Sequence, residues 1–128
     1  MKFFFDNNLA PKIAKGLNCF ISPDHQAVHL KEWFPAKTDD VEWMQKLAHK
    51  ENLIIITADV RIGKNPQEVE AWQQAGHTIF FLKPGWTDMQ FWDQAQKFTK
   101  CFPAIIEKSK TARRGSSFII SANGKIEG

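Results

Sequence analysis

The sequence predicts an α/β fold, a three-layer α/β/α sandwich with a mainly parallel central sheet. Short apolar runs stop at polar turns, as in FFF at 3–5 and LIIIT at 53–57. Runs of β-branched and aromatic residues of this kind are typical of strands buried on both faces of a sheet. Patterns typical of helices separate the runs, and alternating strands and helices favour a parallel sheet with right-handed crossovers. With 128 residues and no internal repeat or linker, the chain is expected to form a single domain.

The first half of the chain predicts two strands and two helices around the run at 3–5. Asn7-Asn8 is expected to cap a helix that ends near Leu17. Residues 27–30 are the convincing strand in the next segment, which two prolines interrupt. Thr38-Asp39 then begin a strong helix that leads into the strand at 53–57.

The second half continues the alternation. Asn65-Pro66 is a good start for a helix that ends near Gly76, and a strand is expected over 78–82. A capping box at 87–90 predicts a helix to about residue 100, and residues 104–109 add a helical turn or two. Residues 118–120 and a strand after an Asn-Gly turn predict a small hairpin or an edge strand.

The composition is that of a globular cytoplasmic protein. Hydrophobic residues make up 43% of the chain, yet no apolar stretch approaches the length of a membrane span. Met1-Lys2 leads directly into the first strand, so the start does not read as a signal peptide. Cys19 and Cys101 lack metal-ligand spacing and are expected to be free thiols. We therefore expect a soluble protein of the cytoplasm with no membrane association.

Three acids converge if the first strand and the strand at 53–57 are neighbours. Asp6 follows the first of these strands, Asp59 follows the second, and Asp40 lies in the first turn of the helix between them. In open α/β sheets, ligands bind outside the carboxyl ends of the strands. Clustered carboxylates are tolerated when a cation neutralises them, and ligands that are all oxygen suit Mg²⁺ or Mn²⁺. The sequence therefore predicts a metal site that can activate water and stabilise charge on a phosphodiester.

Each of these acids also has an ordinary structural explanation. Asp40, or Asp39 beside it, fits a helix N-cap or a first-turn carboxylate. Asp6 fits a cap for the next helix, and Asp59 fits a turn residue after a strand. The joint arrangement of the three acids favours the metal site over these separate explanations.

Polar groups around Asp59 lie where a substrate would arrive. The Thr57 hydroxyl is suited to orient a carboxylate or a metal-bound water molecule. Arg61 and Lys64 are suited to contact phosphates. Arg61 equally fits an ion pair with a neighbouring acid. The Asn7 side chain is suited either to support a metal ligand or to cap a helix.

The excess positive charge lies in the last part of the chain. The net charge is +3, and residues 104–128 carry five Lys and Arg against two Asp and Glu. Arg113 and Arg114 fall in a polar stretch that ends in Gly115-Ser116-Ser117. Such a stretch favours a loop that meets phosphates, although a solvated loop without a partner fits as well.

The remaining polar and aromatic residues give weaker signals. The four histidines lack HExxH spacing and are expected on the surface or in structural roles. The five tryptophans are expected to pack in the core or at an interface, with Trp86 and Phe91 the most exposed aromatic residues. Asp88 or Asp93 is a candidate fourth acid, and Asp88 also fits the first turn of its helix.

Three segments together resemble a known family. The opening FFFDNNLAPKIAKGL, the Asp40-x-x-Trp43 helix and the block IITADVRIGKNPQEVEAW are similar to PIN-like domains, and within them to VapC45-like toxin domains. The following GHTIFFLKPGW extends the resemblance over most of residues 1–92. It implies one PIN-like domain over residues 1–128, with a basic extension at about 104–128. It also implies metal ligation by Asp6 and Asp59, with Asp40 as the third acid.

The leading hypothesis is an Mg²⁺- or Mn²⁺-dependent endoribonuclease. The resemblance implies the toxin of a type II toxin–antitoxin pair, with RNA as substrate and a cognate antitoxin protein as partner. The abundance of Trp and Phe is compatible with a homodimer. The alternatives are a non-catalytic RNA- or protein-binding module, and a phospho-accepting receiver-like protein in which Lys83 reaches the acids.

Overall fold

The chain folds around one sheet in a computed structural model that describes residues 1–35, 38–39, 42–43, 46, 53–59 and 63–128. Its strands are β1 (Lys2–Phe5), β2 (Gln26–His29), β3 (Leu53–Thr57), β4 (Thr78–Leu82), β5 (Ser117–Ile120) and β6 (Ile126–Glu127). Their order is β2-β1-β3-β4-β5-β6, and every pairing is parallel except that of β5 with β6. The predicted mainly parallel sheet is confirmed.

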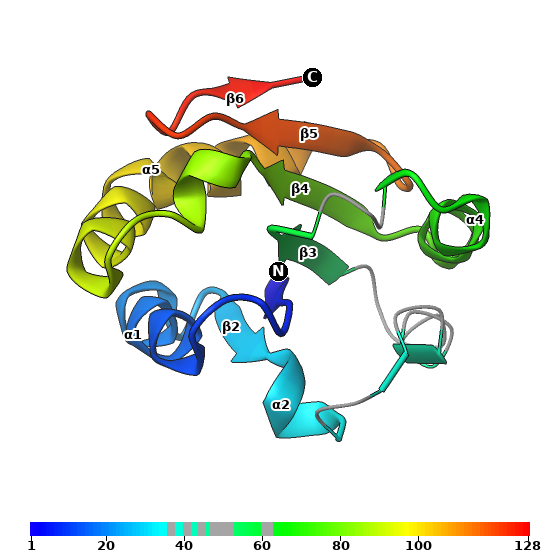
Figure 1. Ribbon diagram of the computed structural model, residues 1–128, viewed down its shortest axis with the longest axis horizontal. Coiled ribbons are helices and arrows are strands. Elements are labelled where there is room, and N and C mark those ends of the chain that lie inside the picture. The colour runs from blue at the N-terminus through cyan, green and yellow to red at the C-terminus, as the bar shows by residue number, and fades with distance from the viewer. Residues whose placement is uncertain (36–37, 40–41, 44–45, 47–52, 60–62) are drawn as a thin grey trace.

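Helices cover both faces of this sheet. They are α1 (Pro11–Ile21), α2 (Leu30–Trp33), α4 (Pro66–Ala75), the 3-10 helix η2 (Pro84–Trp86) and α5 (Phe91–Thr111). Helices α1 and α5 lie against one face and α4 lies against the other, as Figure 1 shows. The three-layer prediction is therefore also confirmed. Within the part of the chain that the structure describes, no helix is long and apolar enough to cross a membrane.

Side-chain alternation along the strands divides the core into two parts. Phe3 and Phe5 of β1 pack with α1 and α5, whereas Phe4 packs on the other face with Trp72 of α4 and with Trp43. Successive strand residues point to opposite faces, so an apolar run without polar interruptions buries both. This is why the runs at 3–5 and 53–57 identify strands of the sheet interior.

Helix α1 begins later than predicted. It starts at Pro11 and ends at Ile21, and no side chain caps its first turn. Proline suits this first position because its missing N–H would have no partner inside the helix. Asn7 and Asn8 instead form a turn between β1 and α1. The prediction that they cap a helix is wrong.

Helix α5 is one continuous helix where two shorter segments were expected. It passes through Pro103, and its N-cap is Gln90, without a side-chain cap hydrogen bond. Phe98, Phe102 and Ile105 are buried against the sheet on both sides of the proline. Burial of this apolar stripe therefore maintains the helix through a residue that usually ends one.

Trp86 is fully buried, which overturns the prediction that it is among the most exposed aromatic residues. Its indole Nε1 donates to the Ser121 carbonyl oxygen at 2.7 Å. This bond gives the buried indole N–H a hydrogen-bond acceptor. The most exposed aromatic side chains among the described residues are instead Trp92 and Phe20, at 77% and 72%.

Candidate active site at the carboxyl edge of the sheet

Strands β1 and β3 are parallel neighbours, as the predicted convergence of their acids requires. Phe5 pairs with Ile56, and the Asp6 N–H continues the ladder by donating to the Ile56 carbonyl oxygen at 3.0 Å. The carboxyl ends of both strands therefore meet at one edge of the sheet. Asp6 and Thr57 lie directly beside each other there.

The Asp6 side chain is buried, with 4% of the residue exposed. The Thr57 hydroxyl donates to its Oδ2 at 2.7 Å, and the Asn7 N–H donates to its Oδ1 at 2.6 Å. A buried carboxylate is costly unless such donors compensate for the lost hydration. These two bonds fix the orientation of the carboxylate.

Thr57 links Asp6 to the loop that carries Asp59. Its side chain is fully buried, and its Oγ1 accepts a hydrogen bond from the Asp59 N–H at 3.0 Å. The Asp59 residue itself is half-buried. One hydroxyl thus contacts both a carboxylate of the site and the backbone that positions the other acid. The Thr57 hydroxyl therefore contacts a carboxylate, and its predicted part in metal or substrate binding stays a prediction.

Asn8 adds a second link between the two loops. Its Oδ1 accepts from the Ala58 N–H at 3.3 Å, which joins the β1–α1 turn to the segment after β3. From the sequence, Asn8 was predicted only to cap a helix. The repeated Asn after Asp6 was the available signal, because an amide side chain in such a turn can hydrogen-bond nearby backbone groups.

His29 supports the loop after Asp6 from the other side. Its Nδ1 accepts from the Lys31 N–H at 3.1 Å, so the proton is on Nε2, which donates to the Leu9 carbonyl oxygen at 2.6 Å. Leu9 in turn donates its N–H to the Asp6 carbonyl oxygen at 3.1 Å. Burial lowers the pKa of His29, which favours this neutral form. The structural role expected of the histidines applies to this residue.

The donor set at this edge fits a hard divalent cation. Asp6 and Asp59 offer carboxylate oxygens, and Mg²⁺ is commonly held by one or two carboxylates together with water and substrate phosphates. Asp40, the predicted third acid, lies outside the described residues. Within the described ranges, no group of three or more His, Cys, Asp and Glu side chains could hold a metal ion. Asp39, Asp88 and Asp93 are all exposed.

The predicted substrate contacts divide between two edges of the sheet. Lys64 is exposed in the loop after Asp59 and lines a cavity at the carboxyl end of β4. Arg61 lies outside the described residues. Arg113 and Arg114 precede β5 and lie at the amino edge, so the structure does not bring them to Asp6 and Asp59.

Arg114 has a structural contact at that amino edge. Its Nη2 donates to the Ala75 carbonyl oxygen, at the end of α4, over 3.4 Å. The guanidinium lies against Gly76, where a Cβ atom would collide with it. Gly76 also has a φ of +77°, a conformation that favours glycine. The end of α4 therefore depends on the Arg114 guanidinium and on the missing side chain of Gly76.

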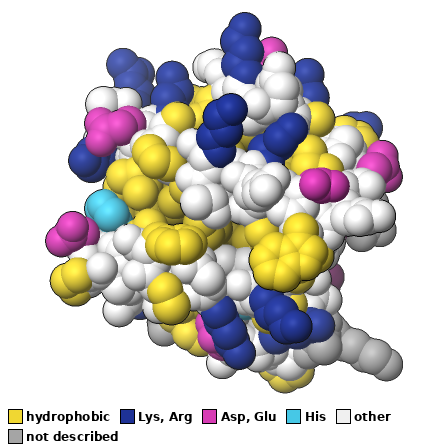
Figure 2. Space-filling view, turned by 90° about the vertical axis from the view of Figure 1, so that its left-hand side faces the viewer, with side chains coloured by type: hydrophobic (Ala, Val, Ile, Leu, Met, Phe, Trp, Pro, Cys, Tyr) yellow, Lys and Arg dark blue, Asp and Glu magenta, His cyan; other side chains and the backbone are white. Residues whose placement is uncertain are grey.

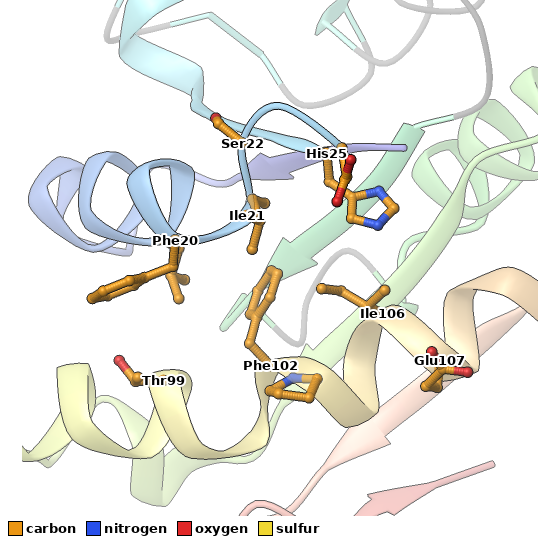
Figure 3. Close-up of a pocket in the computed structure, with 11 residues that line it drawn as sticks. Phe20, Ile21, Ser22, His25, Thr99, Phe102, Ile106 and Glu107 are labelled. Atoms are coloured by element: carbon orange, nitrogen blue, oxygen red, sulfur yellow. The ribbon is translucent and has the colours of Figure 1, made fainter.

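A separate hollow lies between α1 and α5. It has a volume of about 400 Å³, and Figure 3 shows Phe20 and Ile21 reaching from α1 toward Thr99, Phe102 and Ile106 of α5. Figure 2 shows hydrophobic side chains in a band across this side of the molecule, with Lys and Arg above and below it. The lining contains none of the predicted site residues.

The sequence matches a family model over the part that forms the site. The model describes the PIN-like domain and matches residues 1–84, which include Asp6, Thr57 and Asp59. A comparison with curated proteins and one with solved structures gave no significant match. PIN domains are generally nucleases that depend on divalent metal ions. Since the match covers more than half of the 128 residues, the chain belongs to the PIN-like domain family.

Proposed function

We propose that this protein is a metal-dependent endoribonuclease that hydrolyses phosphodiester bonds of RNA. The observation that carries the proposal is the buried Asp6 carboxylate, oriented by Thr57 beside the loop of Asp59. Family membership supports the nuclease class. The buried acid lies at the carboxyl edge of a parallel sheet, and folds of this kind bind their ligands at that edge.

Each residue of the site has a defined task in this proposal. Asp6 and Asp59 hold Mg²⁺ or Mn²⁺, and Asp40 is the proposed third acid. A bound divalent cation lowers the pKa of water and offsets the charge that develops on the phosphate. Thr57 and the Asn7 N–H keep the Asp6 carboxylate in place, so no reorientation is needed when the substrate arrives.

Cations near the acids complete the substrate contacts. Lys64 is proposed to contact a backbone phosphate, and Arg61 is proposed for the same task. Arg113 and Arg114 lie at the amino edge, so any phosphate they contact belongs to a more distant part of a long RNA. Phosphate contacts of this kind add affinity that depends on salt but carry no sequence preference.

The test is cleavage of a mixed pool of cellular RNA by the full chain with Mg²⁺ or Mn²⁺. We expect cleavage that EDTA abolishes and that Asp6→Asn reduces below detection. Glu70→Gln is the matched control, because Glu70 is an exposed acid on α4 that also loses its charge. Circular dichroism checks that both variants are folded. Full activity of Asp6→Asn contradicts the assignment.

We further propose that the nuclease is the toxin of a type II toxin–antitoxin pair, of the VapC-like group. The resemblance of the opening and of the 55–72 block supports this assignment. Induced expression of the wild-type chain is expected to stop growth of a bacterial host, whereas Asp6→Asn is expected not to do so. Normal growth in cells with demonstrated RNA cleavage would confine the proposal to the nuclease. The cognate antitoxin is the partner that would restore growth.

A non-catalytic binding module is the second candidate. It is favoured by the finding that, outside the segment of Asp40, the described acids form no cluster of three. This candidate predicts RNA binding in EDTA that adding metal does not convert to cleavage. Cleavage that requires metal and Asp6 eliminates it.

The face between α1 and α5 is proposed to bind a second copy of the chain. Phe20 is 72% exposed and borders two adjoining hollows, one lined by Asp24 and Glu107 and the other by Lys12 and Trp92. A two-fold axis through such a face brings the acidic end of one copy to the basic end of the other. The apolar band in Figure 2 supplies the surface that the dimer would bury.

A further inference from the structure

A row of side chains runs across the sheet from the acids to a separate cavity. Asp6 lies beside Thr57, Thr57 pairs with Phe81 of β4, and Phe81 pairs with Ile119 of β5. Paired residues of parallel strands point to the same face of a sheet. Thr57, Phe81 and Ile119 therefore share one face at the same level.

No described helix covers this face beyond β4. Phe81 is only half-buried and Ile119 is 41% exposed, although Phe118 and Ile120 beside it are buried on the opposite face. A cavity of about 340 Å³ lies over these two side chains. An exposed large apolar side chain at the floor of a cavity is typical of a binding surface.

Positive charge borders the cavity. Lys64 and Lys83 line it, and no acid is among the described residues of the lining. Lys83 Nζ lies 3.5 Å from Glu127 Oε2, but both side chains are about half exposed, so water screens this pair. The cavity therefore combines an apolar floor with cations at its border. This combination suits a nucleobase and the phosphates beside it.

Gly63, four residues after Asp59 in the chain, lines the cavity. It packs on the Phe81 ring, because a Cβ atom at Gly63 would lie 3.2 Å from Phe81 Cζ. Neighbouring strands are about 4.8 Å apart, so Phe81 and Ile119 lie roughly 5 and 10 Å from Thr57. At this distance, one nucleic-acid strand can contact both the acids and the cavity.

We propose that this cavity, formed by Phe81, Ile119, Lys64 and Lys83, is a subsite for a nucleotide of single-stranded RNA adjacent to the bond that is cleaved. The inference rests on the proposed ribonuclease function and extends it to the form of the substrate. The base packs on Phe81 and Ile119, and the lysines contact its flanking phosphates. A base in a duplex has both faces stacked, so this subsite selects unpaired RNA.

Binding without cleavage tests the subsite. A short fluorescein-labelled single-stranded RNA is titrated with the full chain in EDTA, and fluorescence anisotropy gives Kd. We expect Ile119→Glu and Lys64→Glu to raise Kd at least tenfold. Ala104→Glu and Lys15→Glu are the matched controls, because both residues are exposed on α5 and α1 and the charge changes are the same. The Kd of each control is expected to remain within twofold of the wild-type Kd.

Two results of this titration overturn the subsite. One is a wild-type chain that does not bind the RNA, and the other is a pair of cavity variants that bind like their controls. Lys64→Ala adds a variant without charge reversal and is expected to reduce the salt dependence of log Kd by about 0.7. An unchanged salt dependence contradicts a phosphate contact by Lys64. A duplex of the same sequence is expected to bind more weakly than the single strand, and equal binding also contradicts the inference.

Cleavage assays on the same variants separate this inference from the proposed function. Wild-type cleavage together with normal binding by Ile119→Glu would retain the nuclease and reject the subsite. Weakened binding by Ile119→Glu without any wild-type cleavage would retain the cavity as a binding site for single-stranded RNA and reject the nuclease. Thermal unfolding of each variant distinguishes a lost contact from a lost fold.

Discussion

The Thr57 hydroxyl donates a hydrogen bond of 2.7 Å to the Asp6 carboxylate, which ties the carboxyl ends of β1 and β3 together at one buried group. The same oxygen accepts the Asp59 N–H at 3.0 Å. The orientation of one acid and the backbone position of the other therefore depend on a single side chain. A substitution of Thr57 therefore tests the site while both acids stay unchanged.

Thr57→Val is expected to reduce RNA cleavage by about 10–100-fold, as is common when a group that orients a metal ligand is removed. Valine has the shape of threonine but cannot donate to Asp6 or accept from Asp59. It is also expected to lower the free energy of unfolding by roughly 1–3 kcal/mol, because buried polar groups lose a partner. Thr57→Ser retains the hydroxyl and is the control for both measurements. Equal activity of the valine and serine variants would show that the hydroxyl has no part in catalysis.

Metal binding is expected to stabilise the fold without any substrate present. Mn²⁺ at about 100 times its Kd should add about 2.7 kcal/mol to the free energy of unfolding, measured as a rise in Tm. Asp6→Asn and Asp59→Asn are expected to lose this rise because each removes a charged oxygen ligand. Glu70→Gln, at an exposed acid on α4, should keep it. A rise that persists in both site variants would place the metal elsewhere.

The stability of the fold is expected to fall between pH 6.5 and about 4. Burial, followed by the nearby Arg114 charge, lowers the pKa of His77 from 6.5 to about 4. Below pH 6.5 the unfolded chain therefore binds a proton that the folded chain does not, so stability is lost as the pH falls. The contribution is about 3 kcal/mol over this window.

His77→Asn should flatten this pH dependence of unfolding. The His77 Nδ1 accepts the Leu53 N–H at 3.2 Å, and the asparagine Oδ1 offers an acceptor near the same position without titrating. Chemical denaturation at pH 7 and at pH 4.5 measures the difference. If the free energy of unfolding changes as much between pH 7 and pH 4.5 in His77→Asn as in the wild type, the pH dependence belongs to other groups.

Arg114→Gln is expected to lower the free energy of unfolding by about 1 kcal/mol. The substitution removes the guanidinium that donates to the Ala75 carbonyl oxygen at the end of α4. Arg113→Gln is the matched control, since it makes the same change in charge at the neighbouring exposed position. Urea denaturation compares the two. Equal stability would assign no structural role to the Arg114 contact.

Trp92→Glu is expected to convert a dimer into a monomer if the face between α1 and α5 binds a second copy. The Trp92 side chain is 77% exposed and lines one of the hollows beside Phe20. Sedimentation measurements over a range of concentrations give the oligomeric state, with Ala104→Glu as the control. A wild-type monomer at all concentrations contradicts the self-association.

The sequence predicted the sheet and the two acids at its edge because their signals are local. An apolar run such as that at 53–57 fills both faces of one strand, so it is recognisable without its neighbours. The start of α4 was also predictable, since Asn65 accepts the Gln67 N–H as an N-cap does. The start of α1 and the length of α5 were mispredicted, because burial against the sheet outweighed the local signals at Asn7 and Pro103.

The sequence by itself determined which segments form buried strands and which acids follow them, because these properties depend on residues adjacent in the chain. Only the tertiary structure decided that Thr57 binds Asp6, that Arg114 contacts the opposite edge, and that Phe81 and Ile119 continue the row from Thr57. These contacts depend on strand order and register. Pairing between segments distant in the chain sets both, so neither follows from the residues of one segment alone.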